Sequence, residues 1–168
     1  MDRVEELKAK VLKAQSENDI ASLYVLEQEA QETFDEDTLG GFYANILDLA
    51  LERLTDTLES HRKMDLNEVQ DFATTRALYE YAMEHYSAGQ LSDASALFEV
   101  LSGITNDERF SLSLKFHTFA SAEKMSLDDF LYNLADLQAT EVNGTFFISG
   151  FTKKAQELLD NAQQQGAS

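Results

Sequence analysis

The 168-residue sequence contains no cysteine, no proline and only seven glycines. Without cysteine, disulfides, thiolate catalysis and cysteine-based zinc or iron–sulfur sites are excluded. The scarcity of helix-breaking residues leaves long periodic segments uninterrupted, which favours an all-α fold. The N-terminal stretch lacks an apolar signal core, and no run reaches the roughly 18 apolar residues of a membrane span. We therefore expect a cytoplasmic protein without a membrane span.

Basic residues are also scarce, since 13 Lys and Arg stand against 31 Asp and Glu for a net charge of −18. Such a field repels phosphate backbones and anionic membranes, which argues against nucleic-acid binding. Partners are expected to be basic or apolar. Because the acidic residues are spread along both halves, the charge locates no site, and solubility alone is an equally good explanation for it.

Apolar residues at helical spacing predict three helices in an N-terminal helical region over residues 1–64. The second begins at a capping pair formed by Ser16 and Asp19, and the third begins at Asp37 or Thr38. We expect TPR-like (tetratricopeptide-like) helix hairpins over 65–138, and a linker with a C-terminal helix over 139–168. Together these parts are expected to form one compact domain.

The hairpin prediction depends most on residues 77–106, ALYEYAMEHYSAGQLSDASALFEVLSGITN. Ala82 and Ala94 are small where two antiparallel helices would cross, and Phe98 is a large residue that fills the space beside the crossing. Gly89 supplies the positive φ angle that the end of a helix requires. Ser92 is then a candidate N-cap for the next helix.

A second, degenerate unit is predicted to follow from Asn106 or Asp107. Leu127-Asp128-Asp129-Phe130 repeats the pattern Leu91-Ser92-Asp93-Ala94, and Ser126 with Asp129 gives another capping signal. The small residues of the first unit are missing, because Phe116 falls where Ala82 would map and Met125 replaces Gly89. We expect this unit to be irregular.

No catalytic or metal site is apparent. The three histidines, His61, His85 and His117, are far apart and none has a ligand spacing such as HxxxH. No glycine-rich phosphate loop, nucleophile elbow or dinucleotide fingerprint is present. We expect no cofactor, no metal and no enzymatic activity, although a tightly bound metal or cofactor would bring an enzyme back into consideration.

The segment at 140–150, TEVNGTFFISG, interrupts the helical pattern. Asn143-Gly144 is a turn signal, and the Phe146-Phe147-Ile148 run favours β structure but is too short to build a sheet. It is interpreted either as a plug in the core or as a segment that docks on the chain itself or on a partner.

The stretch LYEYAMEHYSAGQLSDASALFEVLSGITNDERF lies within residues 69–136, which resemble the class II chaperones of bacterial type III secretion. These are small acidic TPR proteins that hold translocator subunits before export. The resemblance implies a groove, lined by the first helix of each unit, that receives an extended client peptide. It also allows a homodimer, since a shorter N-terminal helix dimerises in that family.

The TPR positions that face the groove map onto seven residues of this sequence. Tyrosine offers apolar area with a polar tip, and methionine adapts to varied shapes, so both suit peptide binding. The alternative is that Tyr79 and Tyr86 pack on the N-terminal helices. The expected partner-binding residues are Arg76, Tyr79, Met83 and Tyr86 in the first unit and Phe110, Ser113 and His117 in the second.

Two functional hypotheses follow. The first is a non-enzymatic chaperone or adaptor, of a bacterial type III secretion system, that captures an apolar or extended segment of a client protein. The second is a structural or regulatory helical protein that binds a basic partner through its acidic surface. Raising the ionic strength should weaken acidic-surface binding steeply and apolar capture much less.

Overall fold

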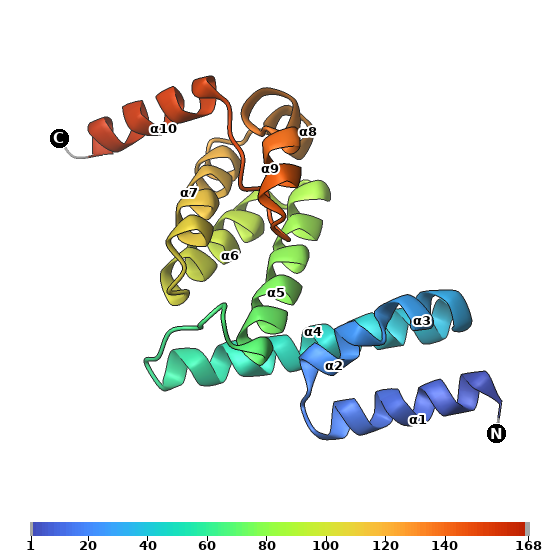
Figure 1. Cartoon of the computed structure of the whole chain (residues 1–168). Coiled ribbons are helices and arrows are strands. Elements are labelled where there is room, and N and C mark those ends of the chain that lie inside the picture. The colour runs from blue at the N-terminus through green and yellow to red at the C-terminus, as the bar shows by residue number, and fades with distance from the viewer. Residues whose placement is uncertain (1, 167–168) are drawn as a thin grey trace. The chain divides into compact units, whose positions relative to one another are not determined.

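The protein is all-α, as the sequence predicted (Figure 1). The structure is a computed structural model that describes residues 2–166. Within that range the chain forms ten α-helices and one π-helical turn, and an isolated antiparallel bridge pairs Ala135 with Phe151. The chain divides into two compact units, residues 1–78 and 79–168, and the division falls inside the helix Val69–Ser87.

The N-terminal unit contains α1 (Arg3–Ser16), α2 (Ile20–Val25), α3 (Glu27–Thr33), α4 (Glu36–Glu59) and the first part of α5 (Val69–Ser87). Aspartates begin three of these helices, because Asp2, Asp19 and Asp35 each accept the backbone N–H three residues further on. Asp35 therefore begins α4, in place of the predicted Asp37 or Thr38. The core side chains include Leu7, Val11, Ile20, Leu23, Ala30, Phe42, Ile46 and Ala50.

The predicted second helix is divided in two at Leu26. The Leu26 N–H donates to the carbonyls of both Ser22 and Leu23, which tightens the turn and ends α2. Periodicity alone did not predict this break because the apolar spacing continues across it. Ser16 does not cap α2, since its hydroxyl donates to the Lys13 carbonyl within α1.

A buried carboxylate joins α4, α5 and the loop between them. Asp71 Oδ1 accepts from Arg53 Nη2 at 2.9 Å and from Arg53 Nε at 3.1 Å. Its Oδ2 accepts from the Asp65 backbone N–H at 3.0 Å, and Arg62 Nη1 lies 3.6 Å away. A buried charge is tolerated only with such partners, so Asp71 has a structural role.

The C-terminal unit contains the rest of α5, then α6 (Leu91–Ile104), α7 (Glu108–Ala122), α8 (Leu127–Asp129), the π-helical turn η1 (Phe130–Leu134), α9 (Leu137–Asn143) and α10 (Lys153–Gly166). Helices α6 and α7 form an antiparallel hairpin. Ser102 and Ser111 exchange hydrogen bonds at its closed end, and Lys124 donates to Ser92 at the other.

Within the predicted hairpin at 77–106, the expected burial and the expected positive φ angle are both found. Ala82, Ala94 and Phe98 are fully buried, and Phe98 lies 6.0 to 6.2 Å, centroid to centroid, from two tyrosine rings of α5. Gly89 has a φ of 81° at the end of α5. Ser92 is not the N-cap, because α6 begins one residue earlier, at Leu91.

The predicted second unit, which begins at α7, is irregular, as its missing small residues indicated. Asp107 and Ser126 cap their helices as expected, but the helix after Ser126 becomes the π-helical turn η1 within a few residues. Phe116, which occupies the position of a small residue, stacks on Phe151 with ring centroids 4.0 Å apart. The large side chain is thus accommodated by the C-terminal segment.

Candidate functional site

Five of the seven predicted partner-binding residues lie in the interior of the C-terminal unit. Their side chains are buried, whereas those of Arg76 and Met83 are partly exposed. Buried side chains are not available to a partner in this conformation. The five buried residues are Tyr79, Tyr86, Phe110, Ser113 and His117.

Arg76 belongs to the N-terminal unit, whereas the other six residues belong to the C-terminal unit. Its guanidinium forms an ion pair with Glu27, at 3.2 Å between Nη2 and Oε1. The same group lies over the Tyr24 ring, with Cζ 4.1 Å from the ring centroid. These contacts give Arg76 a structural role in that unit.

A chain of hydrogen bonds runs through the centre of the C-terminal unit. The Ile148 backbone N–H donates to Tyr79 Oη at 3.0 Å, and Tyr79 Oη lies 2.8 Å from His117 Nε2. His117 Nδ1 lies 2.8 Å from the Ser113 carbonyl, which can only accept, so Nδ1 carries the proton. Tyr79 therefore donates to an unprotonated Nε2, and every polar atom in the chain has a partner.

The same arrangement keeps His117 neutral. Complete burial lowers the pKa of His117 to about 4, an effect that outweighs the hydrogen bond to Ser113. Burial also raises the pKa of Tyr79 well above its ordinary value. A neutral imidazole beside a neutral phenol has a structural role in an apolar interior, where the pair bonds the Ile148 backbone N–H and the Ser113 carbonyl.

Aromatic rings surround this pair. Tyr79 contacts the rings of Phe98, Phe110, Phe146 and Phe147 at centroid distances of 5.9 to 6.4 Å. His117 is likewise enclosed by aromatic rings, at centroid distances of 5.0 to 6.1 Å. We call Tyr79 on α5, together with Phe110 and His117 on α7, the receiving surface.

An extended segment of the chain itself occupies the receiving surface. Residues 145–152, which we call the docked segment, lie between α9 and α10 and run past α5 and α7 (Figure 1). Phe147 packs edge-on against Phe110 with ring centroids 4.9 Å apart, and Ile148 donates to Tyr79. The core-plug interpretation of this segment matches its burial.

The docked segment also pairs through its main chain with the residues before α9. The Asp136 N–H donates to the Gly150 carbonyl at 2.8 Å, and the Thr152 N–H donates to the Leu134 carbonyl at 2.9 Å. Thr140 Oγ1 accepts from the N–H groups of both Ser149 and Gly150, at 3.1 and 2.9 Å. Because the docked segment is not helical, its backbone N–H and C=O groups need partners elsewhere, and these bonds supply them.

Gly150 is the tightest point of this contact. A Cβ atom at Gly150 would lie 2.6 Å from Ala139 Cβ, 2.6 Å from the Asp136 carbonyl oxygen and 3.0 Å from the Thr140 nitrogen. Two of these three neighbours are backbone atoms, which cannot move aside locally. Thr140 and Gly150 were not predicted as determinants of the site, and the only signal was their place in the predicted interruption at 140–150. The structure corrects that prediction, because residues 140–143 are the last residues of α9.

Tyr86 has a separate role at the base of the same unit. Its hydroxyl donates to the Met125 carbonyl at 2.9 Å, and burial raises its pKa, with a further contribution from the nearby charge of Asp129. The contacts of Tyr79 and Tyr86 described here lie within residues 79–168. The sequence allowed these tyrosines either to face a client or to pack on the N-terminal helices. In the structure, the neighbours described here belong instead to the C-terminal unit.

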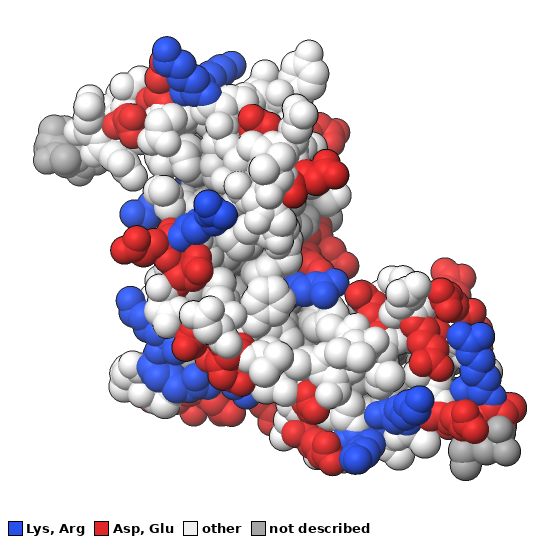
Figure 2. Space-filling model, in the orientation of Figure 1, with Lys and Arg blue, Asp and Glu red and all other residues white. Residues whose placement is uncertain are grey.

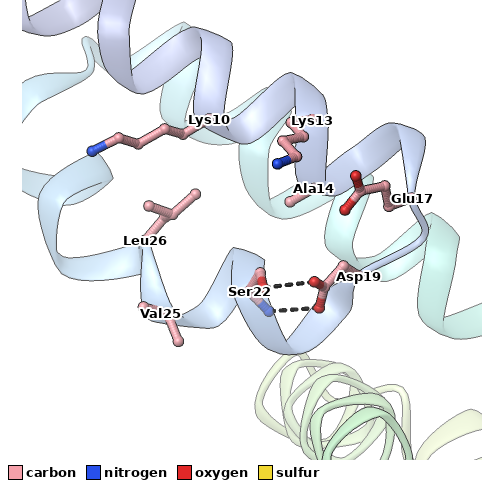
Figure 3. A pocket seen from close by; sticks show the side chains of 8 residues that line it. All are labelled: Lys10, Lys13, Ala14, Glu17, Asp19, Ser22, Val25 and Leu26. Carbon is pink, nitrogen blue, oxygen red and sulfur yellow. Dashed lines mark hydrogen bonds between the residues drawn. The ribbon is translucent and has the colours of Figure 1, made fainter.

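A pocket lies between α1 and α2 (Figure 3), with a volume of about 380 Å³. Its one carboxylate with several partners is Asp19, which accepts from Ser22 and Gln70. Those hydrogen bonds, led by that of the Ser22 hydroxyl, lower the pKa of Asp19. Asp19 is therefore occupied as a helix cap. The lining residues are Lys10, Lys13, Ala14, Glu17, Asp19, Ser22, Val25 and Leu26.

Across residues 2–166, no group of three or more His, Asp or Glu side chains is arranged to hold a metal ion. In the same range no helix is both long enough and apolar enough to cross a membrane. Comparison with known proteins identifies no relative, since no family model, curated protein or solved structure matches the chain.

Proposed function

We propose that the protein is a non-enzymatic chaperone or adaptor that captures an extended, apolar segment of a client protein, in a bacterial type III secretion system. One observation supports capture at the receiving surface. That surface already holds an extended apolar segment, through hydrogen bonds to its backbone and aromatic contacts to its side chains. It therefore has the chemistry that recognition of an extended peptide requires. The secretion context comes from the resemblance of residues 69–136 alone.

Met83 is the predicted residue best suited to test this. Tyr79, Met83 and Tyr86 are spaced for one face of α5, and Met83 alone among them is partly exposed. Replacing Tyr79 by alanine would leave the Ile148 N–H and His117 without a buried partner, so that substitution would test folding rather than binding.

The experiment places a photoreactive amino acid at Met83 in the full chain, in the native host, and identifies cross-linked proteins by mass spectrometry. A matched control carries the same group at the exposed Leu112 on α7. We expect one client to cross-link at Met83 and not at Leu112, and to do so equally at high ionic strength. Equal labelling at both positions, or none at Met83, would refute capture at this surface.

A second candidate function is binding of a basic partner through the acidic surface, which the net charge of −18 favours. On the face that Figure 2 shows, acidic side chains are distributed widely rather than gathered at one place. A partner bound in this way would be released by salt, because exposed charges are screened within about 10 Å at 0.1 M ionic strength. Release of the client by salt would therefore favour this function over capture by apolar contacts.

A further inference from the structure

The docked segment connects α9 to α10, and α9 is the weakly packed helix of the two. Helix α9 has no fully buried residue, and two of its large apolar side chains are exposed, Leu137 at 52% and Val142 at 83%. Gly144, at the end of α9, has a φ of 68° and open space around it. Withdrawal of the segment from the receiving surface would therefore not require α9 to leave a core of its own.

The main-chain contacts of the docked segment do not depend on its sequence. They pair it with residues 134–136, next to the antiparallel bridge between Ala135 and Phe151. An extended segment from another protein could make the same hydrogen bonds, as in recognition by strand addition. The receiving surface is thus able to hold other chains in the same position.

The side-chain contacts do depend on sequence, and they exclude charge. Phe147 and Ile148 are buried, and Phe146 packs 5.8 Å from Phe110 between ring centroids. The only ionisable groups of the receiving surface, Tyr79 and His117, are kept neutral by burial. A charged residue at the position of Phe147 or Ile148 would be buried without a partner. An occupant needs adjacent aromatic residues followed by a branched apolar one.

Glycine is required two positions after the branched residue. At Gly150 any side chain meets Ala139 and the Asp136 carbonyl at 2.6 Å. Because the clash involves the backbone of residues that themselves pair with the segment, a larger residue would push the occupant away from its hydrogen-bond partners.

We propose that the docked segment occupies the client site, and that the client presents the same chemistry in trans. This client is an extended, uncharged segment with two adjacent aromatic residues, a branched apolar residue and, two positions later, glycine. The proposal rests on the proposed function and specifies its partner. The segment thus acts as an internal competitor.

The test uses the full chain and a fluorescein-labelled peptide with the sequence of residues 143–152, NGTFFISGFT. We expect the wild-type chain to bind it weakly, because its own segment fills the surface. Gly150→Ala in the chain weakens the internal competitor, so fluorescence anisotropy should show binding at least about tenfold tighter. A second peptide, with alanine in place of its internal glycine, the counterpart of Gly150, carries the same clash and should bind about tenfold more weakly to that variant.

Gly103→Ala is the matched control, since Gly103 is exposed in α6 and a Cβ there meets nothing within 4 Å. It should bind the peptide as the wild type does. If circular dichroism shows that Gly150→Ala is unfolded, Phe146→Ala replaces it, because Phe146 is only partly buried.

Equal binding by the wild type and the segment variants, or equal binding of the two peptides, would overturn the proposal. The two proposals can fail separately. A client that cross-links at Met83 while the peptide fails to bind the folded segment variants would leave capture standing and remove the internal competitor. Peptide binding without any cross-linked client would keep the competitor and remove the chaperone function.

Discussion

Acidification should weaken the C-terminal unit through one buried group, His117. Its pKa is about 4 in the folded chain, against 6.5 as the ordinary value. Between these two values the unfolded chain binds a proton that the folded chain does not, so the free energy of unfolding falls as the pH falls. The loss is about 1.4 kcal/mol per pH unit, or about 3 kcal/mol over the whole window. Above pH 6.5 the histidine is neutral in both the folded and the unfolded chain, and none of this stability is lost.

The measurement is urea unfolding at several pH values between about 7.5 and about 4.5. Since the chain has no tryptophan, near-UV circular dichroism of its six tyrosines reports the transition. The reference is His117→Gln, whose amide can still accept from Tyr79 but takes up no proton. Hydrogen bonds lower the pKa values of carboxylates such as Asp19 and Asp35, so their protonation in acid also lowers the free energy of unfolding. This effect is the same in both proteins.

The stability difference between wild type and His117→Gln therefore isolates the histidine. We expect it to be constant above pH 6.5 and to decline by about 1.4 kcal/mol for each pH unit below. Protonated His117 would need an acceptor at Nε2, and Tyr79 already donates there, so the decline has a structural cause. A difference that stays constant down to about pH 4.5 would refute the neutral, buried histidine.

Two further predictions concern stability in urea. Asp71→Asn should lower the free energy of unfolding by about 2 kcal/mol, because it leaves the guanidinium of Arg53, only 30% exposed, without its closest anion; a loss within error would contradict the role given to Asp71. Gly89→Ala should cost about 1 kcal/mol because of its φ of 81°, whereas Gly103→Ala, in the last turn of α6, should add about 0.5 kcal/mol. Equal effects at the two glycines would show that backbone conformation does not set the difference.

Sequence reasoning succeeded where the determinants are local. The capping residues Asp107 and Ser126 act over three residues, and the positive φ of Gly89 depends on one position. The burial of Phe98 follows from helical spacing within one hairpin. Such features can be read from a short window because the interacting groups are fixed by the geometry of the helix.

The receiving surface could not be predicted in this way. Ile148 meets Tyr79 across 69 residues, and His117 meets Tyr79 across 38. Periodicity identified Tyr79 as a residue of one helix face, but nothing local indicates which segment covers that face. The 140–150 interruption was recognised as a plug or docking segment, yet its position on the predicted client site required the three-dimensional structure.

The internal competitor sets a threshold that any client has to exceed. The docked segment is tethered at both ends, so its effective concentration at the receiving surface is on the order of millimolar or higher. If docking is favoured by about 4 kcal/mol, only about one molecule in a thousand has the surface open, and the apparent Kd of a client rises about a thousandfold. A client with no more contacts than the docked segment would therefore bind weakly. Tight binding requires contacts beyond it, and the partly exposed Met83, on the same face of α5 as Tyr79, is where we expect them.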